Sequence, residues 1–279
     1  MNFTVEILSG LCNVLKSFIT ALSMGEANIL PRFDAHFDAD YREILDDSLI
    51  CHNANEFGES FVSARLLILK SEEEHQTDLI NDAKALGDHP NIRNKKLAPL
   101  FSTKTIDWFY DKSLICDKVF NRIMYGIGKI KWKDEVLSEV ERVSQNFEYP
   151  LLSVQIRTWT HQFDPPNCTS IRDGVIRDYN FETYKDAIDQ FLNSDTPPRT
   201  IFLTADVDSV LPEYLKYLKN YDVNVITYTQ PKDVTQMQYS AATMLIASKC
   251  DMLVCCRLST FAECIWWFGE CKAKTIPVF

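Results

Sequence analysis

The sequence predicts an α/β protein made of two domains. From residue 151 onward, strand and helix patterns alternate regularly, which is typical of a doubly wound parallel sheet. Residues 3–30 carry a strand, a turn, a helix and a second strand, the building block of another parallel sheet. The chain has 279 residues, with 46% hydrophobic and 24% charged side chains, so it can form two ordinary globular cores.

The first half opens with that strand–helix–strand unit. An apolar run at residues 3–8 predicts a strand, which Ser9 and Gly10 close. Residues 11–22 place their apolar side chains at helical spacing, and Gly25 ends the helix before a second strand at residues 27–30.

The rest of the first half has weaker patterns. Residues 34–47 are acidic and irregular, with a short helix expected at 40–45. The remaining expectations, in order, are a strand at 61–70, a polar helix at 72–86, an exposed connection at 87–97 and helices at 105–120 and 133–147. We place the domain boundary near Glu148, giving domains 1–148 and 149–279.

The second half alternates without interruption. The expected strands are 151–156, 200–204, 223–227, 252–255 and 274–278. The expected helices are 181–192, 211–219, 235–247 and 259–268. A long polar loop separates the first strand from the first helix.

Charge and cysteine content narrow the class of protein. The net charge of −10 argues against nucleic-acid binding, which needs a basic surface. The nine cysteines form no C-x-x-C pair and the five histidines are scattered, so we expect no metal cluster. Buried free thiols, no signal peptide and no transmembrane-length apolar run indicate a cytoplasmic protein.

Arg157 is the first candidate site residue. It follows the apolar strand 151–156 directly, and ligands of open α/β sheets bind beyond the carboxyl ends of the strands. Its planar guanidinium is suited to a phosphate group. An ion pair with a carboxylate at the edge of the sheet explains an arginine there equally well.

Two further strands end in polar groups. Asp206 follows the strand at 200–204, where its carboxylate can accept hydrogen bonds from a base or a ribose. Ser259 and Thr260 follow the strand at 252–255, at the expected start of a helix. The N–H groups of a helix N-terminus can bind an anion, although Ser259 is also a common N-cap residue.

In their order, these strand ends resemble the three peptide motifs of the fucosyltransferase superfamily. The matching segments are Gln155-Ile156-Arg157, Thr204-Ala205-Asp206 and Ser259-Thr260-Phe261. The superfamily includes bacterial chitooligosaccharide, α1,2- and α1,6-fucosyltransferases and protein O-fucosyltransferases. Near the N-terminus, residues 9–13 resemble its G-x-G-N turn, and residues 37–45 resemble its aromatic and acidic segment.

The resemblance implies a GT-B-type fold, with two Rossmann-like domains facing each other across a cleft. It implies inverting, metal-independent transfer of a sugar, fucose or a related one, from a nucleoside diphosphate, most often GDP, to a glycan. No cofactor beyond that donor is implied. Carried over by position, Arg157 would neutralise the leaving diphosphate and Asp206 would contact the nucleoside. Ser259, Thr260 and Phe261 would bind the phosphates, and Asn13 would lie near the sugar.

Three residues depart from the pattern of the superfamily. Gln155 stands in place of the usual histidine, Thr158 in place of a common second arginine and Thr160 in place of an acid. One lost arginine removes a charge-assisted bond, each worth about 1.5–3 kcal/mol. Arg257, close to Ser259, can restore the charge, and the donor can be another GDP- or UDP-linked sugar.

The loop after Arg157 offers the candidate bases. An inverting transferase uses a carboxylate or a histidine to take the proton of the acceptor hydroxyl. Asp164 is our first choice because two prolines follow it, and His161 and Asp173 are the alternatives. An acid before a proline is also a common start of a turn.

Two other functions remain open. Asp206 and Asp208 form a D-x-D pair, which metal-dependent transferases use to hold a divalent cation and a UDP-sugar. The changes at Gln155, Thr158 and Thr160 also fit a nucleotide-sugar-binding protein without catalysis.

Overall fold

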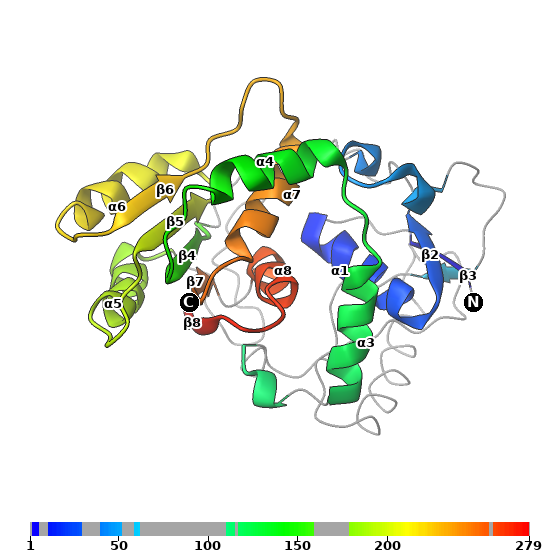
Figure 1. Cartoon of the computed structure of the whole chain (residues 1–279), viewed down its shortest axis with the longest axis horizontal. Coiled ribbons are helices and arrows are strands. Elements are labelled where there is room, and N and C mark those ends of the chain that lie inside the picture. The colour runs from blue at the N-terminus through cyan, green and yellow to red at the C-terminus, as the bar shows by residue number, and fades with distance from the viewer. Residues whose placement is uncertain are drawn as a thin grey trace. The chain divides into compact units, whose positions relative to one another are not determined.

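The computed structural model describes residues 2–5, 11–29, 40–51, 59–61, 110–114, 117–158, 179–256 and 259–278. The chain divides into two compact units. Unit 1 comprises Met1–Leu137 and Asp233–Ala241, and unit 2 comprises Ser138–Lys232 and Ala242–Phe279. Figure 1 labels the elements, and each unit is described by itself below. The boundary near Glu148 and a cleft between two domains stay predictions.

Unit 1 contains a small parallel sheet with the strand order β2-β1-β3. Its strands are β1 (Asn2–Val5), β2 (Glu26–Ile29) and β3 (Glu59–Phe61), and α1 (Leu11–Met24) connects the first two. The predicted strand–helix–strand unit is therefore confirmed. The helix turns its apolar face into the core, with Leu15, Phe18 and Ile19 fully inaccessible to solvent.

Two expectations for the first half are corrected. Instead of an α-helix at 40–45, the structure has a 3-10 helix at Tyr41–Glu43, which Asp40 caps at its N-terminus by accepting a hydrogen bond from the N–H of Arg42. The helix ends at Ile44, where the backbone has left the helical region with φ −121°. Instead of one helix at 105–120, a 3-10 helix at Lys112–Leu114 precedes α3 (Asp117–Gly128). Asp111 accepts a hydrogen bond from the N–H of Ser113 and so starts that short turn. The expected helix 72–86 lies outside the described residues.

Unit 2 contains a five-stranded parallel sheet with the order β6-β5-β4-β7-β8. The strands are β4 (Leu151–Ile156), β5 (Thr200–Ala205), β6 (Asn224–Thr227), β7 (Met252–Cys256) and β8 (Lys274–Val278). The connecting helices are α5 (Phe181–Leu192), α6 (Leu211–Leu218), α7 (Gln236–Ala247) and α8 (Thr260–Phe268), and α4 (Asp134–Ser144) precedes the sheet. The predicted alternation and parallel sheet are confirmed.

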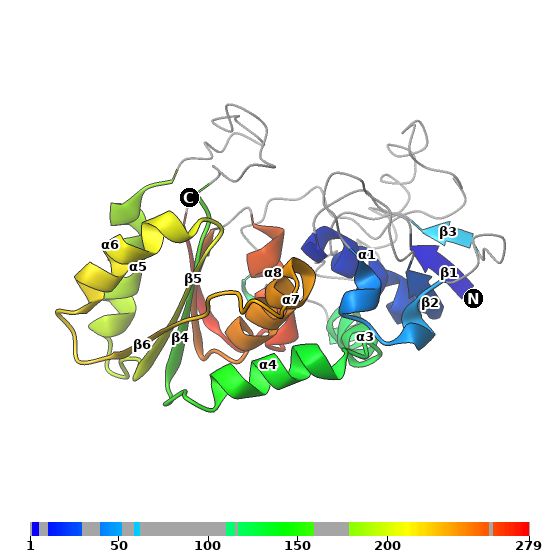
Figure 2. The same ribbon diagram turned by 90° about the horizontal axis from the view of Figure 1, so that it is seen from above.

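Helices cover both faces of this sheet (Figure 2). On one face, Leu152, Val154 and Ile156 of β4 pack with buried side chains of α5 and α6, Tyr184 and Tyr214 among them. Helix α8 lies on the other face. Because side chains alternate along a strand, Ser153, Gln155 and Arg157 point toward this second face. Because both faces are covered, β4 is buried at all six positions, including the polar Ser153 and Gln155.

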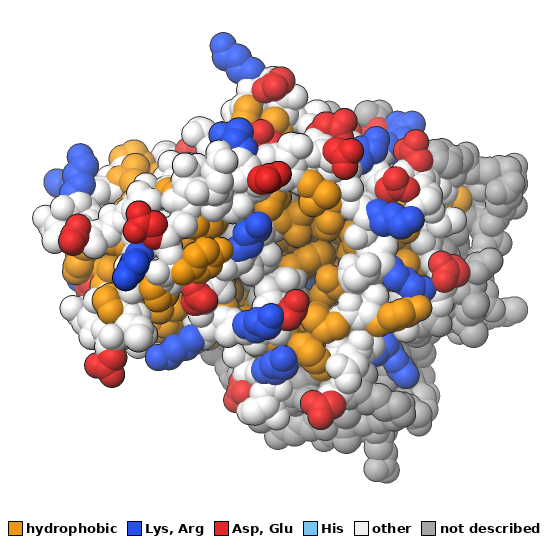
Figure 3. Space-filling model, in the orientation of Figure 1, with side chains coloured by type: hydrophobic (Ala, Val, Ile, Leu, Met, Phe, Trp, Pro, Cys, Tyr) orange, Lys and Arg blue, Asp and Glu red, His pale blue; other side chains and the backbone are white. Residues whose placement is uncertain are grey.

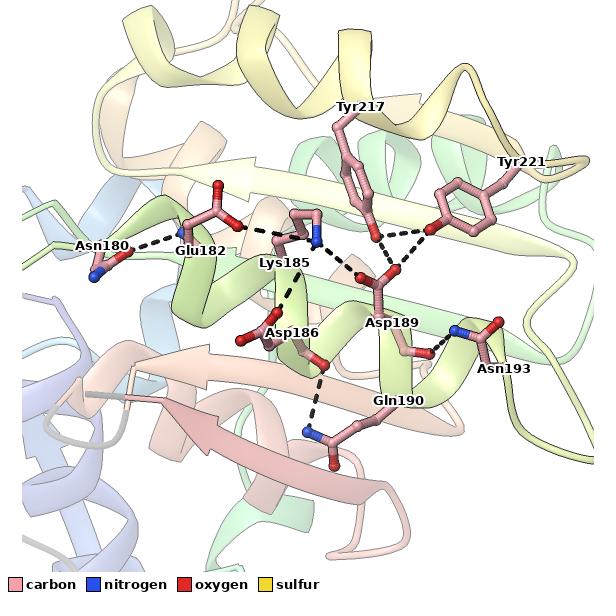
Figure 4. A network of polar contacts seen from close by, with 9 residues as sticks. All are labelled: Asn180, Glu182, Lys185, Asp186, Asp189, Gln190, Asn193, Tyr217 and Tyr221. Atoms are coloured by element: carbon pink, nitrogen blue, oxygen red, sulfur yellow. Dashed lines mark hydrogen bonds and ion pairs between the residues drawn. The ribbon is translucent and has the colours of Figure 1, made fainter.

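The outer surface of α5 and α6 carries a polar network (Figure 4). Asp189 accepts hydrogen bonds from the hydroxyls of Tyr217 and Tyr221, the latter at 2.7 Å, and from Lys185 Nζ at 3.1 Å. Burial alone would raise the pKa of Asp189, but these hydrogen bonds and the charge of Lys185 outweigh burial and lower the pKa. The network therefore stabilises the ionised carboxylate.

Asp189→Asn is expected to lower the free energy of unfolding of unit 2 at neutral pH by about 1–2 kcal/mol. Because the folded pKa is depressed, this contribution is complete above the unfolded pKa of about 4 and is lost as the pH falls through the folded value. Denaturant unfolding of both proteins from pH 7 to pH 2 measures it. Asp186→Asn is the control, because Asp186 is exposed on the same helix. If the difference in free energy of unfolding between wild type and Asp189→Asn stayed the same from pH 7 to pH 2, the stabilisation would not come from the ionised carboxylate of Asp189.

Charged side chains of both signs are interspersed on the face of the described surface that Figure 3 shows. Among the described residues, no helix is both long and apolar enough to cross a bilayer. The seven described cysteines are buried thiols.

Candidate functional site

The order of the strands in unit 2 identifies where a ligand is expected. The chain runs from β4 outward to β5 and β6, and then returns to place β7 on the other side of β4. The direction of winding therefore reverses between β4 and β7. In open α/β sheets, ligands bind outside the carboxyl ends of the strands at such a switch point. The residues that follow β4 and β7 belong to this position.

Arg157 follows β4 directly and forms an ion pair with Asp206, which follows the neighbouring strand β5. Arg157 Nη1 lies 2.6 Å from Asp206 Oδ2, and the two side chains are 21% and 10% exposed. The backbone N–H of Asp206 donates to the carbonyl of Ile156 at 3.2 Å, which extends the pairing of β4 with β5. The structure thus brings two predicted site residues into contact.

The same carboxylate also holds the backbone after Arg157. The N–H of Thr158 lies 2.9 Å from Asp206 Oδ1 and 3.1 Å from Oδ2. Thr158 is 5% exposed. Both oxygens of Asp206 are therefore engaged by the segment that carries the arginine.

Tyr184 is a site residue that the sequence did not indicate. Its hydroxyl accepts a hydrogen bond from the backbone N–H of Arg157 at 3.0 Å. Burial raises the pKa of Tyr184 well above its usual range, so the hydroxyl stays neutral. Tyr184 occupies an apolar position of a helix, where nothing in the sequence distinguishes it from an ordinary core tyrosine.

Ser259 lies at the N-terminus of α8, three residues beyond β7. Its hydroxyl accepts a hydrogen bond from the N–H of Ala262 at 3.3 Å, so Ser259 is the N-cap of the helix. Of the two roles predicted for Ser259, N-cap and anion binding, the structure confirms the first. Thr260 and Phe261 form the first turn of α8 and are partly exposed. The first N–H groups of a helix have no carbonyl partner within it and attract anions.

Gln155 lies on β4, two residues before Arg157 and on the same face. It is 4% exposed. Its Nε2 donates to the carbonyl of Ile156 at 3.2 Å, which turns the amide toward the carboxyl end of the strand. Its Oε1 and the hydroxyl of Ser153, also buried, have no hydrogen-bond partner in the described part of the chain. Gln155 supplies an amide, which does not titrate, where a histidine is usual in the superfamily.

The other predicted site residues are not tested. Arg257, His161, Asp164 and Asp173 lie outside the described residues. Asn13 lies in the first turn of α1, in unit 1. Its role near a sugar stays a prediction. No group of His, Cys, Asp and Glu side chains within the described ranges is arranged to hold a metal ion.

Comparison with known proteins gives similarity in structure but not in sequence. No known family profile matches the chain, and no curated protein sequence matches it. The α1,6-fucosyltransferase NodZ, solved after soaking with GDP-fucose, superposes with a TM-score of 0.52 at 9% identity, over 95% of this chain and 92% of NodZ. One NodZ structure from Bradyrhizobium gives a TM-score of 0.51 at 10% identity, over 94% of this chain and 90% of NodZ.

POFUT1 is similar to the same degree. Its complex with GDP-fucose superposes with a TM-score of 0.52 at 12% identity, covering 99% of this chain and 95% of POFUT1. Its apo form gives a TM-score of 0.55 at 12% identity, over 99% and 97%. At such low sequence identities the structural similarity establishes only the fold, and the chemistry has to be argued from the residues of the site. The chain has a fucosyltransferase-like fold along nearly its whole length.

Proposed function

We propose that the protein is a glycosyltransferase that moves a sugar, fucose or a related one, from a GDP-linked donor to a glycan acceptor. The observation that carries this proposal is Arg157, held at the switch point of the sheet of unit 2 in a fold similar to that of two fucosyltransferases. The donor-binding domain would be residues 149–279, and residues 1–148 would bind the acceptor. Buried cysteine thiols fit a cytoplasmic location.

The proposed reaction is an inverting displacement. The oxygen of an acceptor hydroxyl attacks the anomeric carbon from the side opposite the diphosphate, and the bond from that carbon to the phosphate oxygen breaks. Arg157 and the N-terminus of α8 stabilise the negative charge that develops on the departing diphosphate. A base accepts the hydroxyl proton, and Asp164 is our first candidate, followed by His161 and Asp173.

We further propose that the reaction needs no divalent metal. In the metal-dependent alternative, Asp206 and Asp208 would hold the cation. Both oxygens of Asp206 instead accept hydrogen bonds from Arg157 and Thr158, so cation binding would first have to break this arrangement. A fixed guanidinium supplies the positive charge that a metal would otherwise supply.

Titration calorimetry with GDP and UDP, followed by a donor-hydrolysis assay with GDP-fucose, tests the proposal. We expect GDP to bind and GDP-fucose to be hydrolysed slowly at the same rate with and without excess EDTA. Hydrolysis that EDTA abolishes and manganese restores would favour the Asp206–Asp208 metal site. Binding without hydrolysis or transfer to any acceptor would favour the non-catalytic binding protein. Absence of nucleotide binding would refute the proposed function.

A further inference from the structure

Two side chains from different elements hold the segment Arg157-Thr158. Asp206 accepts from the guanidinium of Arg157 and from the N–H of Thr158, and Tyr184 accepts from the N–H of Arg157. We propose that Asp206 is a positioning residue, which orients Arg157 toward the diphosphate, and that it does not contact the nucleoside. This inference rests on the proposed function.

The use of the carboxylate supports this role. Asp206 Oδ2 binds Arg157 Nη1 at 2.6 Å, and Oδ1 binds the Thr158 N–H at 2.9 Å. A contact with a base or a ribose would have to share or displace these bonds, and the side chain is only 10% exposed. A guanidinium has five N–H donors in a rigid plane, so one bond at Nη1 is compatible with a second contact to a phosphate.

The second anchor comes from the opposite face of the sheet. Tyr184 is 2% exposed and packs edge-on against Tyr214, with ring centroids 6.3 Å apart. Its hydroxyl is therefore fixed by the core formed by α5 and α6. Asp206 orients the side chain of Arg157 while Tyr184 fixes its backbone. Such preorganisation lets a charged group stabilise a developing charge without first rearranging.

The test separates affinity for the diphosphate from affinity for the nucleoside. Binding of GDP and of guanosine is measured by calorimetry or competition for wild type, Asp206→Ala and Tyr184→Phe. We expect Asp206→Ala to weaken GDP binding about tenfold or more, the loss expected for a misplaced charge-assisted bond, and to leave guanosine binding unchanged. Tyr184→Phe, which keeps the ring, is expected to weaken GDP binding in the same selective way.

The control is Asp222→Ala, because Asp222 is an exposed aspartate just before β6, at the amino edge of the same sheet. It is expected to bind both ligands like the wild type. A double-mutant cycle supplies the second readout. If Asp206 acts through Arg157, adding Asp206→Ala to an Arg157→Ala protein changes GDP affinity by less than about twofold.

Three outcomes overturn the assignment. Equal losses of GDP and guanosine affinity in Asp206→Ala would show a nucleoside contact. A full additional loss of GDP affinity in the Arg157→Ala background would show that Asp206 acts independently of the arginine. Failure of the wild type to bind GDP or UDP would instead refute the proposed function itself, and this assignment with it. Circular dichroism verifies folding, and Tyr184→Phe keeps the test valid if Asp206→Ala does not fold.

Discussion

Arg157→Ala is expected to lower the rate of sugar transfer by at least about 10²-fold while the protein stays folded. The fixed cation acts where charge develops on the departing diphosphate, so its loss affects the reaction more than the binding of the neutral parts of the donor. Arg157 lies just beyond the carboxyl end of the central strand β4, with its side chain 21% exposed, and is not part of the apolar core. The measurement is the initial rate of transfer or donor hydrolysis, with circular dichroism as the test of folding.

Arg199→Ala is the matched control. Arg199 is exposed and immediately precedes β5, so it lies at the amino edge of the same sheet, away from the carboxyl ends. It should leave the rate unchanged, because a cation at that edge cannot reach a ligand at the switch point. Near-normal turnover by Arg157→Ala would show that the ion pair with Asp206 is structural only.

The sheet of unit 2 was predictable because local sequence and tertiary structure agree there. The run Leu151–Ile156 is apolar at four of its six positions, and the structure buries all of it in the middle of the sheet. The short length of this run predicts a strand, and the turn residues around the following helices predict where those helices begin and end. In the first half, by contrast, polar side chains determine where the short helical turns begin. Asp40 and Asp111 cap short 3-10 turns that the helical spacing of apolar residues does not reveal.

The proximity of Arg157 and Asp206 was predictable from the sequence, but the contact between them was not. Parallel strands end at one edge, so the sequence alone placed Arg157 and Asp206 on the same side of the sheet. Which of two partners the arginine would take, a carboxylate or a phosphate, depends on the order of strands in space. That order makes β5 the neighbour of β4, and the carboxylate contact follows. Tyr184 was missed because its hydroxyl reaches the site from the core.

The packing of α3 on α1 in unit 1 depends on a glycine that the sequence pattern did not single out. A Cβ atom at Gly126 would lie 2.5 Å from the carbonyl oxygen of Ile19 and 3.2 Å from the nitrogen of Ser23. These are backbone atoms of α1, so they can move only if the helices separate. Gly126→Ala is therefore expected to lower the free energy of unfolding of unit 1 by about 1–3 kcal/mol, although alanine favours the helix itself.

Gly128→Ala gives this prediction a control within the same helix. A Cβ atom at Gly128 would meet no atom within 4 Å, so the substitution adds helix propensity without a clash. It is expected to raise stability by up to about 1 kcal/mol. Hydrogen exchange of the α1 and α3 amides reports unit 1 specifically, and should become faster in Gly126→Ala and no faster in Gly128→Ala. Equal protection in the two variants would mean that α1 and α3 do not approach each other at Gly126.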